Sequence, residues 1–216
     1  MQPSMEVRWF LTGTAPKEVE QWFRRGYVSP KDAPIDNEAR DDIYLSLPDS
    51  AALGIKLRAG KKIEVKQRQS STGVQTLRAG IEGGIEQWVK WSFDLMATDD
   101  KGEPIRSPHE IAPPGYWTII KKRRLLRKFA VIAAEKVITV DAVNQRPDEG
   151  CNMELVWLEV NGKQWWSLGF ESFGKLDTVE KNLRLVLEQV LPDPNFPEMR
   201  AEQSYAYPAW LGMLLK

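Results

Sequence analysis

The 216-residue chain has only one cysteine, Cys151, and one histidine, His109. A single cysteine excludes a disulfide framework within the chain and any zinc site built from several thiolates. A single histidine excludes metal sites of the HExxH type, which need two histidines on one helix face. We therefore expect Cys151 to be inert and His109 to be an exposed loop residue without a catalytic role.

The sequence also lacks net charge, because thirty basic residues balance thirty acidic ones. Zero net charge argues against a generic nucleic-acid or membrane-surface binder, although local basic patches remain open. The longest apolar runs, such as residues 130–134, are far shorter than the ~20 residues of a membrane-spanning helix. The first residues show no secretory signal pattern. We predict a cytoplasmic protein with no membrane partner and no duplex nucleic-acid partner.

What the sequence does contain is a series of strands with charged faces. Residues 54–58 and 62–68 predict two strands joined by a turn at 59–61. Because side chains alternate along a strand, Lys56 and Arg58 share one face of the first, and Glu64 and Lys66 share one face of the second. A charged face on each of two adjacent strands fits either an outer, solvated surface or a binding surface.

Further strand patterns outnumber helical ones, and hairpins outnumber βαβ patterns. Asn161-Gly162 is a strong hairpin signal between two late strands, and residues 97–115 are expected to form a loop. The pattern predicts a mainly β (α+β) fold, an antiparallel sheet or barrel with helices at 16–25 and 178–190. We expect a barrel domain over residues 1–192 and a C-terminal tail, 193–216, that packs on it.

The most unusual segment is residues 121–128, in which six of eight residues are basic. If it extends a strand, Lys121 and Arg123 face one side while Lys122 and Arg124 face the other. Such a segment is either a solvated strand end or a surface that grips phosphate oxygens. Cations gathered inside a barrel would repel one another unless a polyanion or carboxylates neutralised them.

Several of these segments together resemble the CYTH superfamily, the triphosphate tunnel enzymes. The resemblance lies in Tyr44-Leu-Ser-Leu-Pro-Asp49, Gly54-Ile-Lys-Leu-Arg58, Ile63-Glu-Val-Lys66, Ile120-Lys-Lys-Arg-Arg124, Thr139-Val-Asp141 and Trp157-Leu-Glu159, and spans roughly residues 5–171. It implies an eight-stranded antiparallel tunnel-type barrel that binds triphosphate through basic side chains and Mg²⁺ or Mn²⁺ through carboxylates. The implied phosphate-binding residues are Lys56, Arg58, Lys66, Lys121 and Arg123, and the implied metal ligands are Glu64, Asp141 and Glu159.

The first strand departs from the family pattern. The family has two glutamates and a lysine at alternate positions there, whereas an alignment on Phe10 gives Met5, Val7 and Trp9. A slip of one residue would turn Glu6 and Arg8 inward, but it would supply one carboxylate only. The late acidic strand likewise supplies one glutamate where the family has a pair. Because hard divalent cations need several oxygen ligands, these losses weaken the expectation of a metal site.

Three functions remain open on this sequence. The leading interpretation is a tunnel protein that binds a phosphate-rich anion with weak or no catalysis, its partner being a triphosphate-containing small molecule or inorganic polyphosphate. The alternative is an active, divalent-metal-dependent triphosphate hydrolase whose ligands come from unexpected positions such as Glu6, Glu86 or Glu154. The third is a non-catalytic barrel that binds another protein.

Overall fold

The computed structural model describes residues 1–25, 33–47, 50–94 and 117–214, so the expectations for His109 and for the loop 97–115 lie outside the described residues. These described residues form nine strands and three α-helices. The helices are α1 (Lys17–Arg25), α3 (Val179–Val190) and α4 (Tyr207–Leu214). The strands are β1 (Gln2–Thr12), β2 (Asp36–Leu45), β3 (Leu53–Arg58), β4 (Lys62–Arg78), β5 (Ile81–Asp94), β6 (Trp117–Ile132), β7 (Lys136–Val140), β8 (Gly150–Val160) and β9 (Lys163–Phe173).

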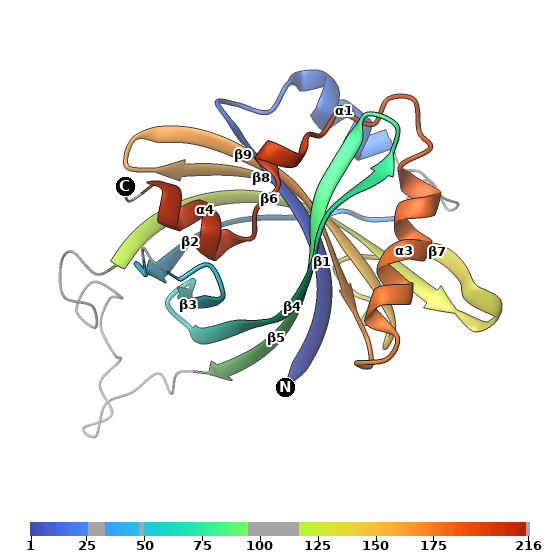
Figure 1. The fold of residues 1–216 in the computed structure, drawn as a ribbon, viewed down its shortest axis with the longest axis horizontal. Helices are drawn as coiled ribbons and strands as arrows, with labels where there is room; N and C mark the ends of the chain where they lie inside the picture. The colour runs from blue at the N-terminus through green and yellow to red at the C-terminus, as the bar shows by residue number, and fades with distance from the viewer. Residues whose placement is uncertain (26–32, 48–49, 95–116, 215–216) are drawn as a thin grey trace.

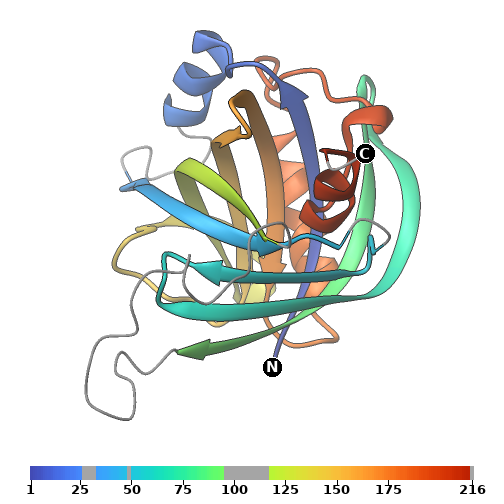
Figure 2. The ribbon, with the colours of Figure 1, turned by 90° about the vertical axis from the view of Figure 1, so that its left-hand side faces the viewer.

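The strands form one sheet that closes on itself. Their order is β2-β3-β4-β5-β1-β9-β8-β6-β7, and an additional pairing of β2 with β6 closes eight of them into a ring (Figures 1 and 2). Strand β7 pairs with the far part of β6, outside the ring. Every pairing between these strands is antiparallel. The predicted fold class, an antiparallel eight-stranded barrel with flanking helices, is confirmed.

Two turns follow directly from the sequence. Asn161 and Gly162 both have positive φ, 50° and 72°, as a two-residue hairpin between β8 and β9 requires. Ala59 and Gly60 have φ of 48° and 67° at the turn between β3 and β4. This second turn sets the two charged strands side by side, with Lys56 opposite Glu64.

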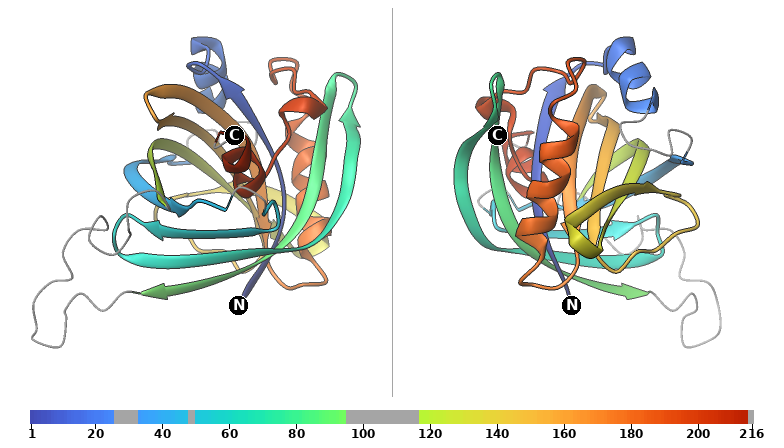
Figure 3. Two further views of the ribbon diagram at one scale, coloured as in Figure 1. Left: turned by 60° about the vertical axis from the view of Figure 1, so that its left-hand side comes forward. Right: turned by 90° about the vertical axis from the view of Figure 1, so that its right-hand side faces the viewer.

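An apolar layer covers part of the barrel's outer face. Helix α3 lies across β1, β8 and β9 (Figure 3, right), and Leu183 and Val186 of this helix are buried against the barrel. Val7 and Trp9 of β1 belong to the same buried cluster. None of the described helices has the length and apolar character of a membrane-crossing segment.

A second apolar cluster lies inside one end of the barrel, where α4 sits within the ring of strands (Figure 1). Trp210 of α4 is fully buried and stacks on Phe10 of β1 with ring centroids 4.5 Å apart. We call this region the apolar end. It comprises Phe10, Tyr44, Ile120, Val156, Leu158 and Val160 of the strands with Trp210 and Leu211 of α4.

Candidate functional site

The rest of the barrel interior is a cavity of about 180 Å³ lined by charged side chains from all eight strands of the ring. Tyr207 and Pro208 of α4 line it on the side of the apolar end. We call it the charged cavity. Its charged residues are eight basic ones, Arg8, Arg40, Lys56, Arg58, Lys66, Lys90, Lys122 and Arg124, and four acidic ones, Glu6, Glu64, Glu154 and Glu171.

The register of β1 sets one wall of this cavity. Glu6 and Arg8 face inward, so the alignment on Phe10 that turned Val7 and Trp9 inward is wrong and the one-residue slip is correct. A strand register that is off by one exchanges its two faces, and the apolar face of β1 is the one buried under α3. The first strand therefore offers one inward carboxylate, Glu6.

Arg8 reaches across the neighbouring strand to Glu154 of β8. Its Nη2 lies 2.6 Å from Glu154 Oε2, and its Nη1 donates to Ser167 at 3.1 Å. Gly169 makes this path available, because a Cβ there would lie 2.7 Å from Arg8 Cζ. Although burial raises the pKa of Glu154, the charges of Arg8 and Arg124 outweigh it and hold that pKa well below its usual range.

Lys66 joins two glutamates from neighbouring strands. Its Nζ lies 2.6 Å from Glu6 Oε2 and 3.0 Å from Glu171 Oε1. Burial opposes ionisation of both carboxyls, but Lys66 and Lys90 lower the pKa of Glu171 to about 2. Burial dominates at Glu6, whose pKa is raised, with the nearby charge of Glu171 acting in the same direction. The ammonium of Lys66 thus occupies the space between the two carboxylates.

Asp42 of β2 is the most deeply buried carboxylate of the interior, with no exposed surface. Lys122 Nζ lies 3.0 Å and Lys56 Nζ 3.5 Å from its Oδ2, while Arg40 Nε donates to its Oδ1 at 3.0 Å. Burial raises the pKa of Asp42, but these three cations together hold it far below its usual range. Lys122 also donates to Tyr44 at 2.7 Å, and burial lowers the pKa of this lysine.

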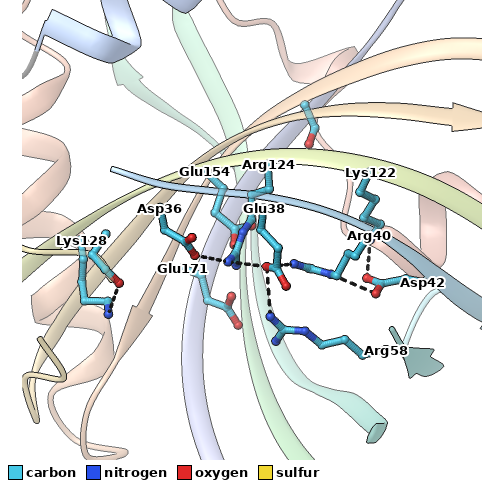
Figure 4. Close-up of polar contacts among 12 residues, drawn as sticks. Asp36, Glu38, Arg40, Asp42, Arg58, Lys122, Arg124, Lys128, Glu154 and Glu171 are labelled. Atoms are coloured by element: carbon cyan, nitrogen blue, oxygen red, sulfur yellow. Dashed lines mark hydrogen bonds and ion pairs between the residues drawn. The ribbon is translucent and has the colours of Figure 1, made fainter. Parts of the chain in front are cut away.

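Glu38, also on β2, accepts hydrogen bonds from three arginines on one carboxylate oxygen. Its Oε2 accepts from Arg124 Nη2 at 2.8 Å, from Arg58 Nη2 at 3.4 Å and from Arg40 Nη1 (Figure 4). Carboxylates therefore neutralise most of the interior cations. This was one of the two ways in which the sequence allowed so many cations to share a barrel.

Lys90 of β5 is the exception among the cations. It lines the charged cavity but makes no ion pair with any residue that the structure describes. It stands where the cavity meets a groove of about 1150 Å³ at the barrel's mouth. Cavity and groove share six lining residues, namely Arg58, Glu64, Lys90, Arg124, Asn152 and Glu171.

Three of the five predicted phosphate-binding residues, Lys56, Arg58 and Lys66, line the charged cavity. The expected inward orientation of Lys121 and Arg123 is wrong. The inward residues of β6 are Lys122 and Arg124, continuing from Ile120 of the apolar end, and the alternation of a strand turns their neighbours outward.

On the outer face Lys121 forms an exposed pair with Glu159 at 2.9 Å. Arg123 lies 3.5 Å from the ring centre of Trp157 and bonds Glu20 of α1. These two basic residues of the segment 121–128 therefore belong to the barrel's outer surface.

The predicted metal ligands do not come together. Glu64 lies in the charged cavity, 2.9 Å from Lys56 Nζ. Asp141 follows the end of β7 outside the cavity and accepts the backbone N–H groups of Val143 and Asn144 at 2.8 and 3.0 Å. Glu159 is exposed on the outer face. The placement of Asp141 and Glu159 in one interior site with Glu64 is wrong.

Other carboxylates take the inward positions. Of the three alternative positions considered on the sequence, Glu6 and Glu154 line the charged cavity, whereas Glu86 pairs with Arg68 beyond it. Glu171 lines the cavity but was missed, although it lies two residues after Gly169 on the same strand face. Each of the four cavity glutamates already contacts a lysine or arginine.

The interior does not fit a preformed metal site. Among the residues that the structure describes, no group of three or more Asp, Glu, His or Cys is placed to hold a metal ion. Octahedral coordination of Mg²⁺ needs carboxylate oxygens that are free to bind it. A divalent cation would first have to displace the lysine and arginine groups that now hold those oxygens.

No protein-family model matches the sequence, and no curated protein matches it. Solved structures do. The PH1819 protein from Pyrococcus horikoshii OT3 has a TM-score of 0.45 and 15% identity over 98% of both chains. The mimivirus capping enzyme triphosphatase has a TM-score of 0.41 and 11% identity, over 87% of this chain and 90% of its own. The S. pombe Pct1 RNA triphosphatase was solved in complex with the Spt5 CTD. It has a TM-score of 0.38 and 10% identity, over 99% of this chain and 80% of its own.

The fold assignment therefore rests on the barrel itself. Eight antiparallel strands close into a ring, and the segments Gly54–Arg58, Ile63–Lys66 and Ile120–Arg124 each turn basic side chains into its interior. The fold that the resemblance implied, an eight-stranded antiparallel barrel with basic side chains turned into its interior, is the fold that the structure has.

Proposed function

We propose that this is a cytoplasmic protein that binds a phosphate-rich anion in the charged cavity, with weak or no catalysis. The ligand class is a triphosphate-containing small molecule or inorganic polyphosphate. One observation carries the proposal: eight basic side chains converge on one cavity, and Lys90, which forms no ion pair within the described residues, stands where that cavity opens to the groove. Phosphate oxygens accept hydrogen bonds from both lysine and arginine.

The energetic cost of this interior supports a functional role. Buried ion pairs rarely stabilise a protein more than well-packed apolar residues of similar volume do. The apolar end shows that the same strands accept apolar side chains at inward positions, as at Phe10 and Val156. The charges of the other half are therefore not required for a barrel to form, and ligand binding gives a reason for them.

Calorimetric titration with inorganic triphosphate at low and high salt tests the proposal. We expect binding that weakens steeply with salt, because several cations act together on one polyanion. The variant Lys90→Met should weaken binding with little loss of stability, because Glu171 and Glu64 keep their ion pairs with Lys66 and Lys56 when Lys90 is removed. Absence of heat at low salt with millimolar triphosphate would reject the proposal and favour the protein-interaction barrel.

One observation favours the second candidate, a triphosphate hydrolase that uses Mg²⁺ or Mn²⁺. Glu6, Glu171 and Glu154 come from the adjacent strands β1, β9 and β8 and all line the charged cavity. Phosphate release from inorganic triphosphate, measured with each metal, separates the two candidates. We expect slow or no release. Turnover above about 1 s⁻¹, a rate usual for enzymes, that is lost in Glu154→Gln would establish the hydrolase instead.

A further inference from the structure

The three arginines around Glu38 form a ready-made site for one phosphoryl group. We propose that Arg40, Arg58 and Arg124 bind the terminal phosphoryl group of the ligand, and that Glu38 fills this site until the ligand displaces it. The inference rests on the proposed function and deepens it, because it names the group that is bound and the residue that competes with it.

The geometry around Glu38 is that of an anion site. Its Oε2 accepts from all three guanidinium groups, at 2.8 Å from Arg124 and 3.4 Å from Arg58, with Arg40 also in contact (Figure 4). One carboxylate oxygen cannot give each of three planar donors a separate, well-directed acceptor. A terminal phosphoryl group presents three oxygens and a charge of about −1.5 to −2. It can therefore give each arginine an oxygen of its own.

Each arginine is also held from another side by a second carboxylate. Arg40 Nε bonds Asp42 at 3.0 Å, Arg58 Nη1 lies 3.4 Å from Glu64, and Arg124 Nη1 bonds Glu154 at 3.1 Å. These contacts remain when Glu38 leaves. The three guanidinium groups thus stay oriented toward the vacated position, and a ligand meets a preorganised site.

The side chain of Glu38 lies at the edge of the groove, where it can turn away from the three arginines into solvent. Its side chain is 32% exposed and lines the groove at the mouth, whereas Arg40 and Arg124 are only 9% and 11% exposed. Arg58 and Arg124 line both groove and cavity. A ligand that arrives through the groove therefore meets Glu38 and Arg58, which are about equally exposed, before the more deeply buried Arg40 and Arg124. Displaced into the groove, the Glu38 carboxylate regains water.

The site predicts which phosphates bind. A linear oligophosphate ends in a phosphoryl group with three free oxygens, whereas every phosphorus of a cyclic metaphosphate has two non-bridging oxygens and one charge. Three separate acceptors suit three arginines, so we expect a preference for ligands with a phosphoryl end.

The experiment titrates wild type, Glu38→Gln and Asp36→Asn with linear inorganic triphosphate and with cyclic trimetaphosphate. Glu38→Gln should bind linear triphosphate roughly tenfold more tightly, because the site no longer has to be freed of a charged competitor. Asp36→Asn is the matched control: it removes a carboxylate of the same strand whose one ion pair within the described residues is with Arg124, at 2.8 Å. Its gain should be clearly smaller. Thermal unfolding checks that both variants fold.

The outcomes separate this inference from the proposed function. If linear triphosphate binds wild type but Glu38→Gln binds no more tightly than Asp36→Asn, the Glu38 site is wrong and the proposed function stands. Equal affinity of wild type for linear and cyclic triphosphate also overturns the phosphoryl site. If neither phosphate binds any of the three proteins, both proposals fail together.

Discussion

The two halves of the barrel interior are built on the same strands but differ in character. The apolar end is packed with apolar side chains, and the charged cavity is lined with lysine, arginine and glutamate. Along β1 the inward residues run from Glu6 and Arg8 to Phe10, and along β6 from Arg124 and Lys122 to Ile120. In each strand the charged positions face the mouth and the apolar ones meet α4. The backbone alternation is continuous across the boundary, so residue type alone decides which half is packed and which half is polar.

The difference separates stability from function in this fold: the apolar end stabilises the barrel, and the charged cavity is the proposed binding site. The apolar end gains from burial of aromatic rings, as in the stack of Phe10 on Trp210 and the edge contact of Trp165 with Trp210 at 5.7 Å. The charged cavity gains little net stability from its ion pairs, because its charges have lost much of their hydration. Substitutions in the two halves should therefore change different measured quantities.

The largest effect on stability is expected in the apolar end. Trp210→Ala should lower the free energy of unfolding by about 3–5 kcal/mol, the usual cost of truncating a fully buried tryptophan. Urea denaturation measures it. Met213→Ala, on the same helix but 44% exposed, is the control and should change stability little. A loss below about 1 kcal/mol for Trp210→Ala would mean that α4 does not stabilise the barrel.

Behind the lining of the charged cavity, Asp42→Asn should change stability and ligand binding in opposite directions. The variant leaves Lys122 without a carboxylate partner, and breaking a buried pair in this way costs about 3 kcal/mol. The added positive charge should at the same time tighten triphosphate binding, because the amide oxygen of asparagine can still accept from Arg40 Nε and keep that arginine oriented. Asp41→Asn, the exposed neighbour on the other strand face, is the control for both measurements. Weaker triphosphate binding in Asp42→Asn would contradict the view of this half as an anion site.

The sequence predicted most of this architecture, because its signals are local. The turn at Ala59, the hairpin at Asn161-Gly162 and the alternation around Lys56 depend on neighbouring residues only. Which face of a strand turns inward is a different matter. It depends on which element covers the strand. Strand β1 is covered by α3, which lies more than 150 residues further along the chain.

The two errors in the candidate site have this same origin. In the segment 121–128 both faces carry basic residues, so alternation alone does not distinguish Lys121 from Lys122. The distinction comes from Ile120, which packs in the apolar end against α4. The resemblance of Thr139-Val-Asp141 to a family strand implied that Asp141 is a metal ligand, but β7 lies outside the ring and, among the described strands, pairs with β6 alone. Both facts depend on elements that are distant in the sequence: α4 packs against Ile120, and the pairings of β6 with β2 and β8 close the ring without β7.

The pH dependence of stability should distinguish the two glutamates that share Lys66. The folded-state pKa of Glu171 is about 2, below its ordinary value of 4.5, so its contribution is present above pH 4.5 and is lost as the pH falls toward 2. The pKa of Glu6 is raised, so its contribution has the opposite sign and falls as the pH rises through that raised value.

Urea denaturation at several pH values measures this difference. Glu171→Gln should flatten the acid side of the stability curve by up to about 1.4 kcal/mol per pH unit. Glu6→Gln should not flatten it, and it should cost least stability at neutral pH. If both variants flatten the acid side equally, the assignment of the charge to Glu171 is wrong.

The smallest effects are expected outside the barrel, at the cations that the sequence had placed in its interior. Lys121→Met should leave triphosphate affinity unchanged, because its ammonium is exposed and paired with Glu159 on the outer face. Its matched partner is Lys90→Met, which removes the same group from the charged cavity and should weaken binding. Calorimetry at low salt compares the two, since low salt gives a distant charge its greatest influence. Equal losses for both lysines would show that the ligand responds to the overall field of the protein. A loss confined to Lys90→Met places the ligand inside the barrel.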